Sequence, residues 1–138
     1  MSQTDTKGLH FKQDYLSEPE CWRALVALLR DVFEIDIGAL DQLGGMDPSS
    51  MPFGWFDADG VLAANFSVFS MPMMIEGKNV KVAALQSGAV RPGHRGKGLY
   101  RDLMRRVFAW IDANSFDLAI LYTDKPAMYE PYGFQVIA

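Results

Sequence analysis

Apolar side chains recur at helical spacing in two segments of the chain. In the first segment, which ends near Glu34, they are Trp22, Leu25, Val26, Leu29, Val32 and Phe33. In the second, residues 99–114, they are Leu99, Leu103, Met104, Val107, Phe108 and Ile111. Spacings of three and four residues predict an amphipathic helix in each segment. Before the first helix, Ser17 is the expected cap residue and Glu20 completes a capping box.

Strand-like runs separated by turn signals fill the stretch between the two helices. We expect strands at residues 52–56, 61–71 and 80–90, with turns at 57–60 and 76–79 and a further short strand at 9–15. This order predicts an antiparallel meander. Gly88 follows Ser87 inside the last of these strands, and a glycine there indicates a bulge or a close backbone approach.

The chain changes pattern after the second helix. A compact apolar run at residues 118–122 predicts a strand, residues 126–130 a short helix, and residues 134–137 a last strand. Residues 35–43 also read as a second short helix before the meander. Strand, loop, helix and strand after a meander indicate an α/β protein of the α+β type, with a mixed sheet and helices on both faces.

Composition narrows the class of protein. The chain has 138 residues, 49% of them apolar and 22% charged, which fits one globular domain spanning residues 1–138. Its single cysteine, Cys21, excludes a disulfide within the chain and indicates a reducing, cytoplasmic setting. No apolar run approaches the ~18 residues of a membrane span, so we expect no membrane partner. The two histidines and one cysteine are too scattered for a structural metal site.

Charge is distributed unevenly. The whole chain carries a net −4, yet residues 91–106 hold six basic residues against one acid, Asp102. The basic residues are Arg91, Arg95, Lys97, Arg101, Arg105 and Arg106. An acidic body repels polyanions, so we expect no nucleic-acid partner. A compact basic segment suits a small anionic ligand, although a solvated helix face would carry the same charges.

A glycine-rich loop lies at the centre of this basic segment. Gly93, Gly96 and Gly98 follow a predicted strand and precede a predicted helix. Glycines let backbone N–H groups face a ligand, and the first turn of a helix adds unpaired N–H groups and the positive end of its dipole. The segment therefore fits a phosphate cradle, or else a plain strand-to-helix turn. A Walker A loop is excluded because Leu99 and Tyr100 follow Gly98 instead of Lys and Ser or Thr.

The residues of this loop resemble motif A of the GNAT superfamily of N-acetyltransferases, whose core is Gln/Arg-x-x-Gly-x-Gly/Ala. Arg95, Gly98 and Tyr100 take the three positions here, with a tyrosine where the family usually has a small residue. Further on, Tyr129-Glu130-Pro131-Tyr132-Gly133-Phe134 is similar to the end of the family's motif B, Tyr-x-x-x-Gly-Phe. The form Arg-Gly-x-Gly-Leu-Tyr is most similar to the Eis-like, aminoglycoside-type branch.

The resemblance implies a GNAT fold, with acetyl-CoA as the acyl donor and no metal. It implies that the strand at 81–90 splays away from the strand at 118–122 and that pantetheine fills the gap. The cofactor-binding residues that it implies are Gly88, Val90, Arg91, Arg95, Gly96, Lys97, Gly98, Leu99 and Tyr100. Tyr129 matches the tyrosine that meets the departing thiolate. A strand N–H near residues 86–88 would polarise the thioester carbonyl, and His94 would lie beside the phosphates.

Several points stay open on the sequence alone. The strand before motif A carries no acid, so the general base is Asp124, Glu34, Asp36 or water. The resemblance favours acetyl transfer to a small-molecule or peptide amine. The alternatives are a non-catalytic acyl-CoA-binding module and a thiol acyltransferase using Cys21. The family usually adds a strand after the one expected at 134–137, so we expect a homodimer or a covalently following domain to cover the open edge.

Overall fold

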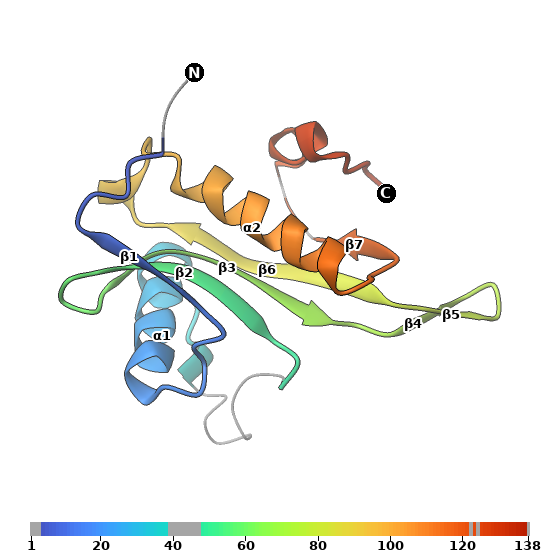
Figure 1. Ribbon diagram of the computed structural model, residues 1–138, viewed down its shortest axis with the longest axis horizontal. Helices are drawn as coiled ribbons and strands as arrows, with labels where there is room; N and C mark the ends of the chain where they lie inside the picture. Colours follow the sequence, from blue (N-terminus) through green and yellow to red (C-terminus); the bar gives the residue numbers. More distant parts are fainter. Residues whose placement is uncertain (1–3, 39–47, 122, 124, 138) are drawn as a thin grey trace.

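A five-stranded sheet forms the centre of the molecule. The computed structural model describes residues 4–38, 48–121, 123 and 125–137. The strand order is β1-β2-β3-β6-β7, and a separate two-stranded hairpin of β4 and β5 extends from one end (Figure 1). The strands are β1 (Leu9–Gln13), β2 (Met51–Asp57), β3 (Leu62–Ser70), β4 (Met73–Ile75), β5 (Lys78–Val80), β6 (Val82–Val90) and β7 (Leu118–Ile120). All pairs are antiparallel except β6 with β7, which is parallel.

Two helices cover opposite faces of this sheet, α1 (Pro19–Phe33) on one and α2 (Leu99–Ala113) on the other (Figure 1). The core under α1 includes Tyr15, Leu25, Leu28, Phe56 and Leu62. The core under α2 includes Phe53, Phe66, Leu103, Met104 and Val107. The mixed sheet with a helix on each face confirms the expected fold class. Short 3-10 turns include η2 (Pro92–His94), η3 (Pro126–Met128) and η4 (Glu130–Tyr132).

Three details of the predicted elements are wrong. The cap residue of α1 is Glu18 and not Ser17, and no side chain caps this helix end. The buried stripe of α1 is centred on Cys21, Leu25, Leu28 and Leu29, whereas Phe33 is half exposed. Residues 134–137 form no strand. The short helix expected at 35–43 lies mostly outside the described residues.

The predicted bulge is present in β6 and changes its course. Ser67 pairs with Gln86 and Asn65 with Ala89, so Phe66 of β3 lies opposite both Ser87 and Gly88. Ser87 adopts the left-handed conformation, with φ 58°. Pairing with β7 stops before this point, because the last matched residues are Ala84 and Ile120. From Leu85 to Val90, β6 therefore has no strand paired to this edge among the described residues, which fits the expected splay.

Among the helices of the described segments, none has the length and apolar character needed to cross a membrane.

Candidate functional site

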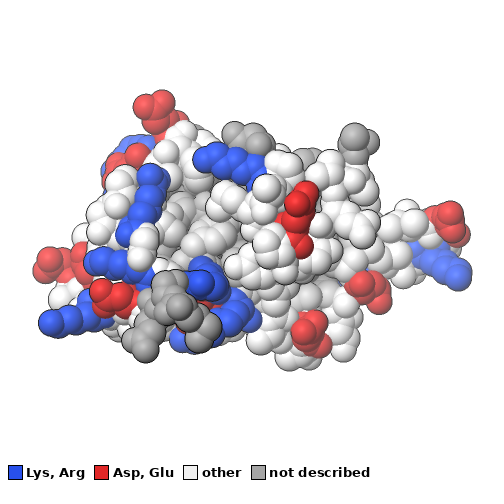
Figure 2. All heavy atoms as spheres, turned by 90° about the horizontal axis from the view of Figure 1, so that it is seen from above, with Lys and Arg blue, Asp and Glu red and all other residues white. Residues whose placement is uncertain are grey.

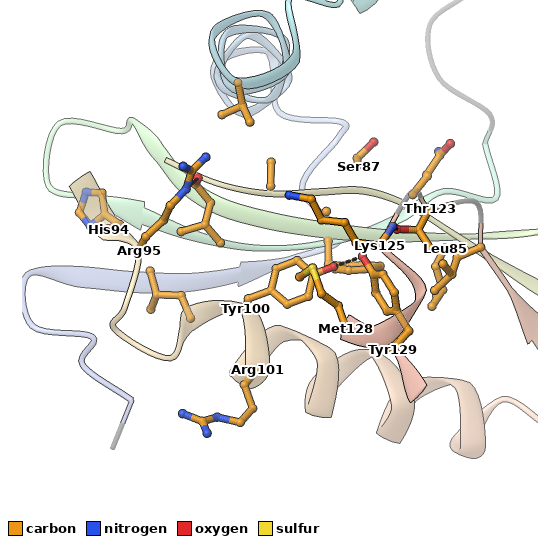
Figure 3. Close-up of a pocket in the computed structure, with 18 of the residues that line it drawn as sticks. Leu85, Ser87, His94, Arg95, Tyr100, Arg101, Thr123, Lys125, Met128 and Tyr129 are labelled. Atoms are coloured by element: carbon orange, nitrogen blue, oxygen red, sulfur yellow. Dashed lines mark hydrogen bonds between the residues drawn. The ribbon is translucent and has the colours of Figure 1, made fainter. Parts of the chain in front are cut away.

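A cleft of about 1070 Å³ opens where β6 and β7 separate. Its lining comes from the end of α1, the bulged half of β6, the glycine loop, the start of α2 and the segment after β7 (Figure 3). Of the sequence-predicted site residues, the cleft brings together Gly88, Val90, Arg95, Gly96, Gly98, Leu99, Tyr100 and Tyr129. Arg91 and Lys97 are not among its lining residues.

One end of the cleft is built from the glycine loop and the first turn of α2. Gly96 and Gly98 have φ values of +78° and +77°, a conformation that other residues adopt only at a cost. Gly98 is also the N-cap of α2. A Cβ on Gly98 would lie 3.2 Å from the backbone of Thr4, so this corner tolerates little side-chain volume. The cradle expected at this helix start stays a prediction, which the two left-handed glycines and the glycine N-cap would permit.

Basic side chains line this end of the cleft. Arg95, Arg101 and His94 all line it, and Figure 3 places His94 and Arg95 side by side beyond the start of α2. The Nδ1 atom of His94 is buried and has no hydrogen-bond partner among the described residues. A buried ring nitrogen without a partner among the described residues, next to Arg95, indicates a place for a ligand oxygen. The N-terminal N–H groups of α2 add the positive end of the helix dipole.

Three other residues of the segment, Arg91, Lys97 and Arg106, form hydrogen bonds within the chain. Arg91 bonds the carbonyl of Leu62 through Nε and pairs with Asp31 through NH1, both at 2.8 Å. Arg106 pairs with the buried carboxylate of Asp102 at 3.0 Å, and Trp55 Nε1 donates to the same carboxylate at 2.8 Å. The carbonyl of Lys97 accepts from the N–H of Asp5 at 2.7 Å. Figure 2 shows the resulting surface, where Lys and Arg gather over the half that carries the start of α2.

Two tyrosine hydroxyls meet further along the cleft, between the pair His94 and Arg95 on one side and Leu85 on the other (Figure 3). Tyr129 lies between η3 and η4, and its hydroxyl is hydrogen bonded to that of Tyr100, from the first turn of α2 (Figure 3). Tyr100 also packs edge-on against Phe66, with ring centroids 5.3 Å apart. Burial, and then the hydrogen bond to Tyr129, raise the pKa of Tyr100 well above its usual range, so this hydroxyl stays protonated. The sequence placed Tyr100 only at the phosphate end and gave no sign of this pairing.

Most of the base candidates lie elsewhere. Glu34 caps the C-terminus of α1, and the carboxylate of Asp36 accepts the N–H of Gly38 at 2.9 Å. Neither lines the cleft, and Asp124 lies outside the described residues. Cys21 is buried under α1, with only 3% of its surface exposed, and is not part of the cleft either. Among the described lining residues there is no Asp or Glu.

Sequence reasoning missed several residues of the lining. Val32 and Phe33, at the end of α1, form part of the wall, as do Lys125 and Met128 from the segment after β7. The exposure of Phe33, at 47%, is explained by its position on the cleft. The helical spacing of the sequence predicts Phe33 only as part of the buried face of α1. These residues come from two segments far apart in the sequence, so no local spacing connects them.

Comparison with known proteins supports this reading of the fold. The family described as "Acetyltransferase (GNAT) domain" matches residues 17–137. No curated protein matches the sequence. Among solved structures, a probable N-acyltransferase from Enterococcus faecalis superposes with a TM-score of 0.77 at 16% identity, over 91% of this chain. This chain spans only 32% of the length of that protein.

Two further solved structures were determined with CoA ligands. A GNAT family N-acetyltransferase (YhbS) from Escherichia coli in complex with CoA gives a TM-score of 0.71 at 21% identity, covering 92% of this chain and 68% of that one. An acetyltransferase from Clostridium acetobutylicum with acetyl-CoA gives 0.71 at 14% identity, covering 94% and 91%. At these identities the likeness establishes the fold. It does not separate the branches of the family, so the Eis-like assignment stays a prediction.

Proposed function

This chain belongs to the GNAT family of acetyltransferases, and from that premise we propose that it transfers an acetyl group from acetyl-CoA to a primary amine. One observation carries the proposal: a single cleft joins a glycine cradle at a helix N-terminus to a pair of tyrosine hydroxyls. An anionic carrier fits the glycine cradle, and acyl-transfer chemistry fits the tyrosine pair. The CoA and acetyl-CoA complexes of the E. coli and C. acetobutylicum relatives support the choice of donor.

The residues of the loop end fit the pyrophosphate of CoA. The backbone from Arg95 to Tyr100 would bind it through N–H groups, because Gly96 and Gly98 leave no side chain in the way. Arg95 and Arg101 would add charge, and His94 Nδ1 would gain the partner that it lacks among the described residues. Pantetheine would then follow the edge of β6 from Val90 toward the bulge at Ser87 and Gly88.

The reaction is one acyl transfer without an acyl-enzyme. The donor would supply an acetyl thioester whose carbonyl carbon bonds to the amine nitrogen as its C–S bond breaks, with one proton leaving nitrogen and one arriving at sulfur. Tyr129 would give the sulfur a hydrogen bond as negative charge develops on it. Tyr100, held protonated by burial, would orient the Tyr129 hydroxyl. Asp124 or water would take the proton from nitrogen.

The proposal is tested with acetyl-CoA and a panel of primary amines of different charge and size. Release of free CoA thiol measures turnover, and the product amine must gain the mass of one acetyl group. Reactions without amine control for hydrolysis of the thioester. Turnover with at least one amine is the expected result, and it should require the intact loop. Failure of every amine, with tight acetyl-CoA binding, would contradict catalysis.

That last outcome would instead support a non-catalytic acyl-CoA-binding module with a regulatory or structural role. One observation favours this second candidate: the described residues of the cleft include no carboxylate that could act as general base. Acetyl-CoA binding is common to both candidates. Burst release of CoA equal to the enzyme concentration, with acetyl attached to the protein, would point to a thiol mechanism through Cys21.

A further inference from the structure

The bulge in β6 lies at the centre of the proposed acyl-donor site, and it carries backbone strain. Ser87 has a φ of 58°, which is unfavourable for a residue with a side chain. A Cβ on Gly88 would lie 2.7 Å from the ring of Phe66, so the backbone is pressed against β3 at this point. Such a conformation persists only where neighbouring groups hold it.

The buried side-chain amide of Asn65, on the neighbouring strand β3, stabilises this conformation. Asn65 Nδ2 donates to the carbonyl of Ser87 at 3.1 Å and to Oγ of Ser67 at 3.0 Å. Asn65 and Ser67 are both completely buried. Asn65 is two residues from Ser67 on β3, so both side chains lie on the same face of the sheet. The amide therefore reaches the bulge from the face opposite to α2.

Tyr15 fixes the orientation of this amide. Its hydroxyl is hydrogen bonded to Oδ1 of Asn65, and the tyrosine is completely buried under α1. Burial raises the pKa of Tyr15 well above its usual range, so the hydroxyl remains a donor. A donor on Oδ1 leaves Nδ2 to face Ser87. The amide thus uses both of its Nδ2 donors and its oxygen, which is what a buried polar group requires.

We propose that Asn65 is a positioning residue for the acyl-donor site, because its amide holds the Ser87 carbonyl and thereby sets the β6 bulge that lines the cleft. The inference rests on the proposed function. Asn65 does not line the cleft, so it acts through Ser87 and Gly88. The bulge lies next to the pantetheine and thioester part of the donor, while the glycine loop lies next to the phosphates. Loss of the amide should therefore weaken binding of the pantetheine part alone.

The experiment compares Asn65→Ala with Ser67→Ala, using acetyl-CoA and adenosine 3′,5′-bisphosphate as probes. The second probe has the nucleotide end of CoA and no pantetheine. Asn65→Ala removes both hydrogen bonds from Nδ2 and the bond from Tyr15, whereas Ser67→Ala removes only the bond from Nδ2 to Ser67 and keeps the bond to Ser87. Asn65→Ala should weaken acetyl-CoA affinity by about tenfold, the cost of one well-placed hydrogen bond, and leave the nucleotide probe within about twofold of the wild type. Ser67→Ala should change neither affinity.

A further variant covers the case in which Asn65→Ala does not fold. Asn65→Asp keeps the shape of the side chain, yet an ionised carboxylate cannot donate to the Ser87 carbonyl, whereas a protonated one can. Its acetyl-CoA affinity, relative to the wild type, should therefore improve as pH falls from about 8 to 5, since burial raises the pKa of a carboxyl group. Ser67→Ala should show no such improvement.

Three results would overturn the inference: equal loss of both probes, wild-type affinity for acetyl-CoA in Asn65→Ala and Asn65→Asp, or the same loss in Ser67→Ala. If the wild-type protein binds neither probe, the proposed function itself fails. The two failures are therefore distinguishable.

Discussion

The hydroxyl of Tyr129 is the group that the account asks to act in the chemical step. Tyr129→Phe keeps the ring and its edge-on contact with Phe134, whose centroid is 6.1 Å away, but removes the hydroxyl. Because the hydroxyl should stabilise charge that develops only in the transition state, kcat should fall by about 10²-fold. The dissociation constant for acetyl-CoA should stay nearly the same. Steady-state kinetics and a binding titration on the same preparation measure the two effects.

Tyr100 offers the comparison for this prediction. Tyr100→Phe removes only the partner of the Tyr129 hydroxyl, so its effect on kcat should be smaller than that of Tyr129→Phe. An unchanged kcat in Tyr129→Phe, with an accepted amine, would remove this residue from the mechanism. A larger effect of Tyr100→Phe would reverse the roles of the two hydroxyls.

An ion pair between Asp31 and Arg91 connects the end of α1 to the residue that follows β6, beside the cleft. The hydrogen bond from Arg91 lowers the pKa of Asp31 below its ordinary value of 3.8. A carboxyl whose pKa is lowered by folding stabilises the protein above its unfolded pKa and loses that contribution as pH falls through the folded pKa. The Tm of the wild type should therefore exceed that of Asp31→Asn near neutral pH, and the difference should close below about pH 4.

Asp112→Asn is the matched control for the ion pair. Asp112 is an exposed carboxylate on α2 that makes no ion pair with the described residues. Its Tm difference from the wild type should stay small across the same pH range. A difference for Asp31→Asn that persists unchanged at pH 2 would show that the ion pair is not its source.

Among the elements, the turn from the glycine loop into α2 decides whether an anion can bind. Gly98→Asp places a side chain and a negative charge in the cradle, at a residue with φ +77° and little free space. The stabilisation by CoA, about 2.7 kcal/mol at 100 times its dissociation constant, should disappear. Gly93→Asp adds the same charge where a Cβ meets nothing within 4 Å. It should keep most of the stabilisation.

The measurement is the rise in Tm on adding CoA, taken relative to each variant's own unliganded Tm. This reference separates ligand binding from the strain that a side chain at residue 98 creates. An equal rise in the wild type and Gly98→Asp would show that CoA does not use the loop.

The spacing of apolar residues predicted most helices and strands correctly. The errors occurred where the local structure depends on residues that lie elsewhere in the fold. Both helices and the strands of the meander follow from apolar spacing and turn residues. The capping box failed because a proline at the first helical position makes Glu18 the cap residue. Residues 134–137 carry strand-like side chains, yet a strand needs a hydrogen-bonded neighbour. Phe134 packs instead on the rings of Phe108 and Tyr129.

In the candidate site, too, local sequence signals were predictable and contacts between distant residues were not. Glycine spacing and the family motifs identified the loop and Tyr129, because these signals are local in sequence. The Tyr100–Tyr129 bond joins residues 29 apart and depends on the whole fold. Asn65 had one available signal, a polar amide within an apolar strand run, which indicates a buried residue that needs partners. Its partners could be identified only from the sheet register.

At the scale of the whole molecule, β7 is the last strand of the sheet order, so its outer edge is open among the described residues. Leu118 on β7 is 39% exposed, and Val136 and Ile137 near the end of the described chain are more exposed still. An apolar open edge favours pairing with another chain. We expect the 138-residue polypeptide to self-associate, with a sedimentation coefficient that rises with concentration.

Leu118→Lys should weaken this association, because a charged side chain on an edge strand opposes pairing. Val61→Lys is the control, since Val61 is similarly exposed, at 42%, but lies in the turn between β2 and β3. A wild-type protein that stays monomeric at every concentration, with its cleft able to bind ligand, would contradict the expectation.

The central claim is that the cleft between β6 and β7 binds acetyl-CoA, and a calorimetric titration of the wild-type protein with acetyl-CoA tests it most directly. The account predicts saturable binding at one site per chain, weakened by added salt because the loop end attracts the phosphates electrostatically. The absence of binding at millimolar acetyl-CoA would contradict the claim.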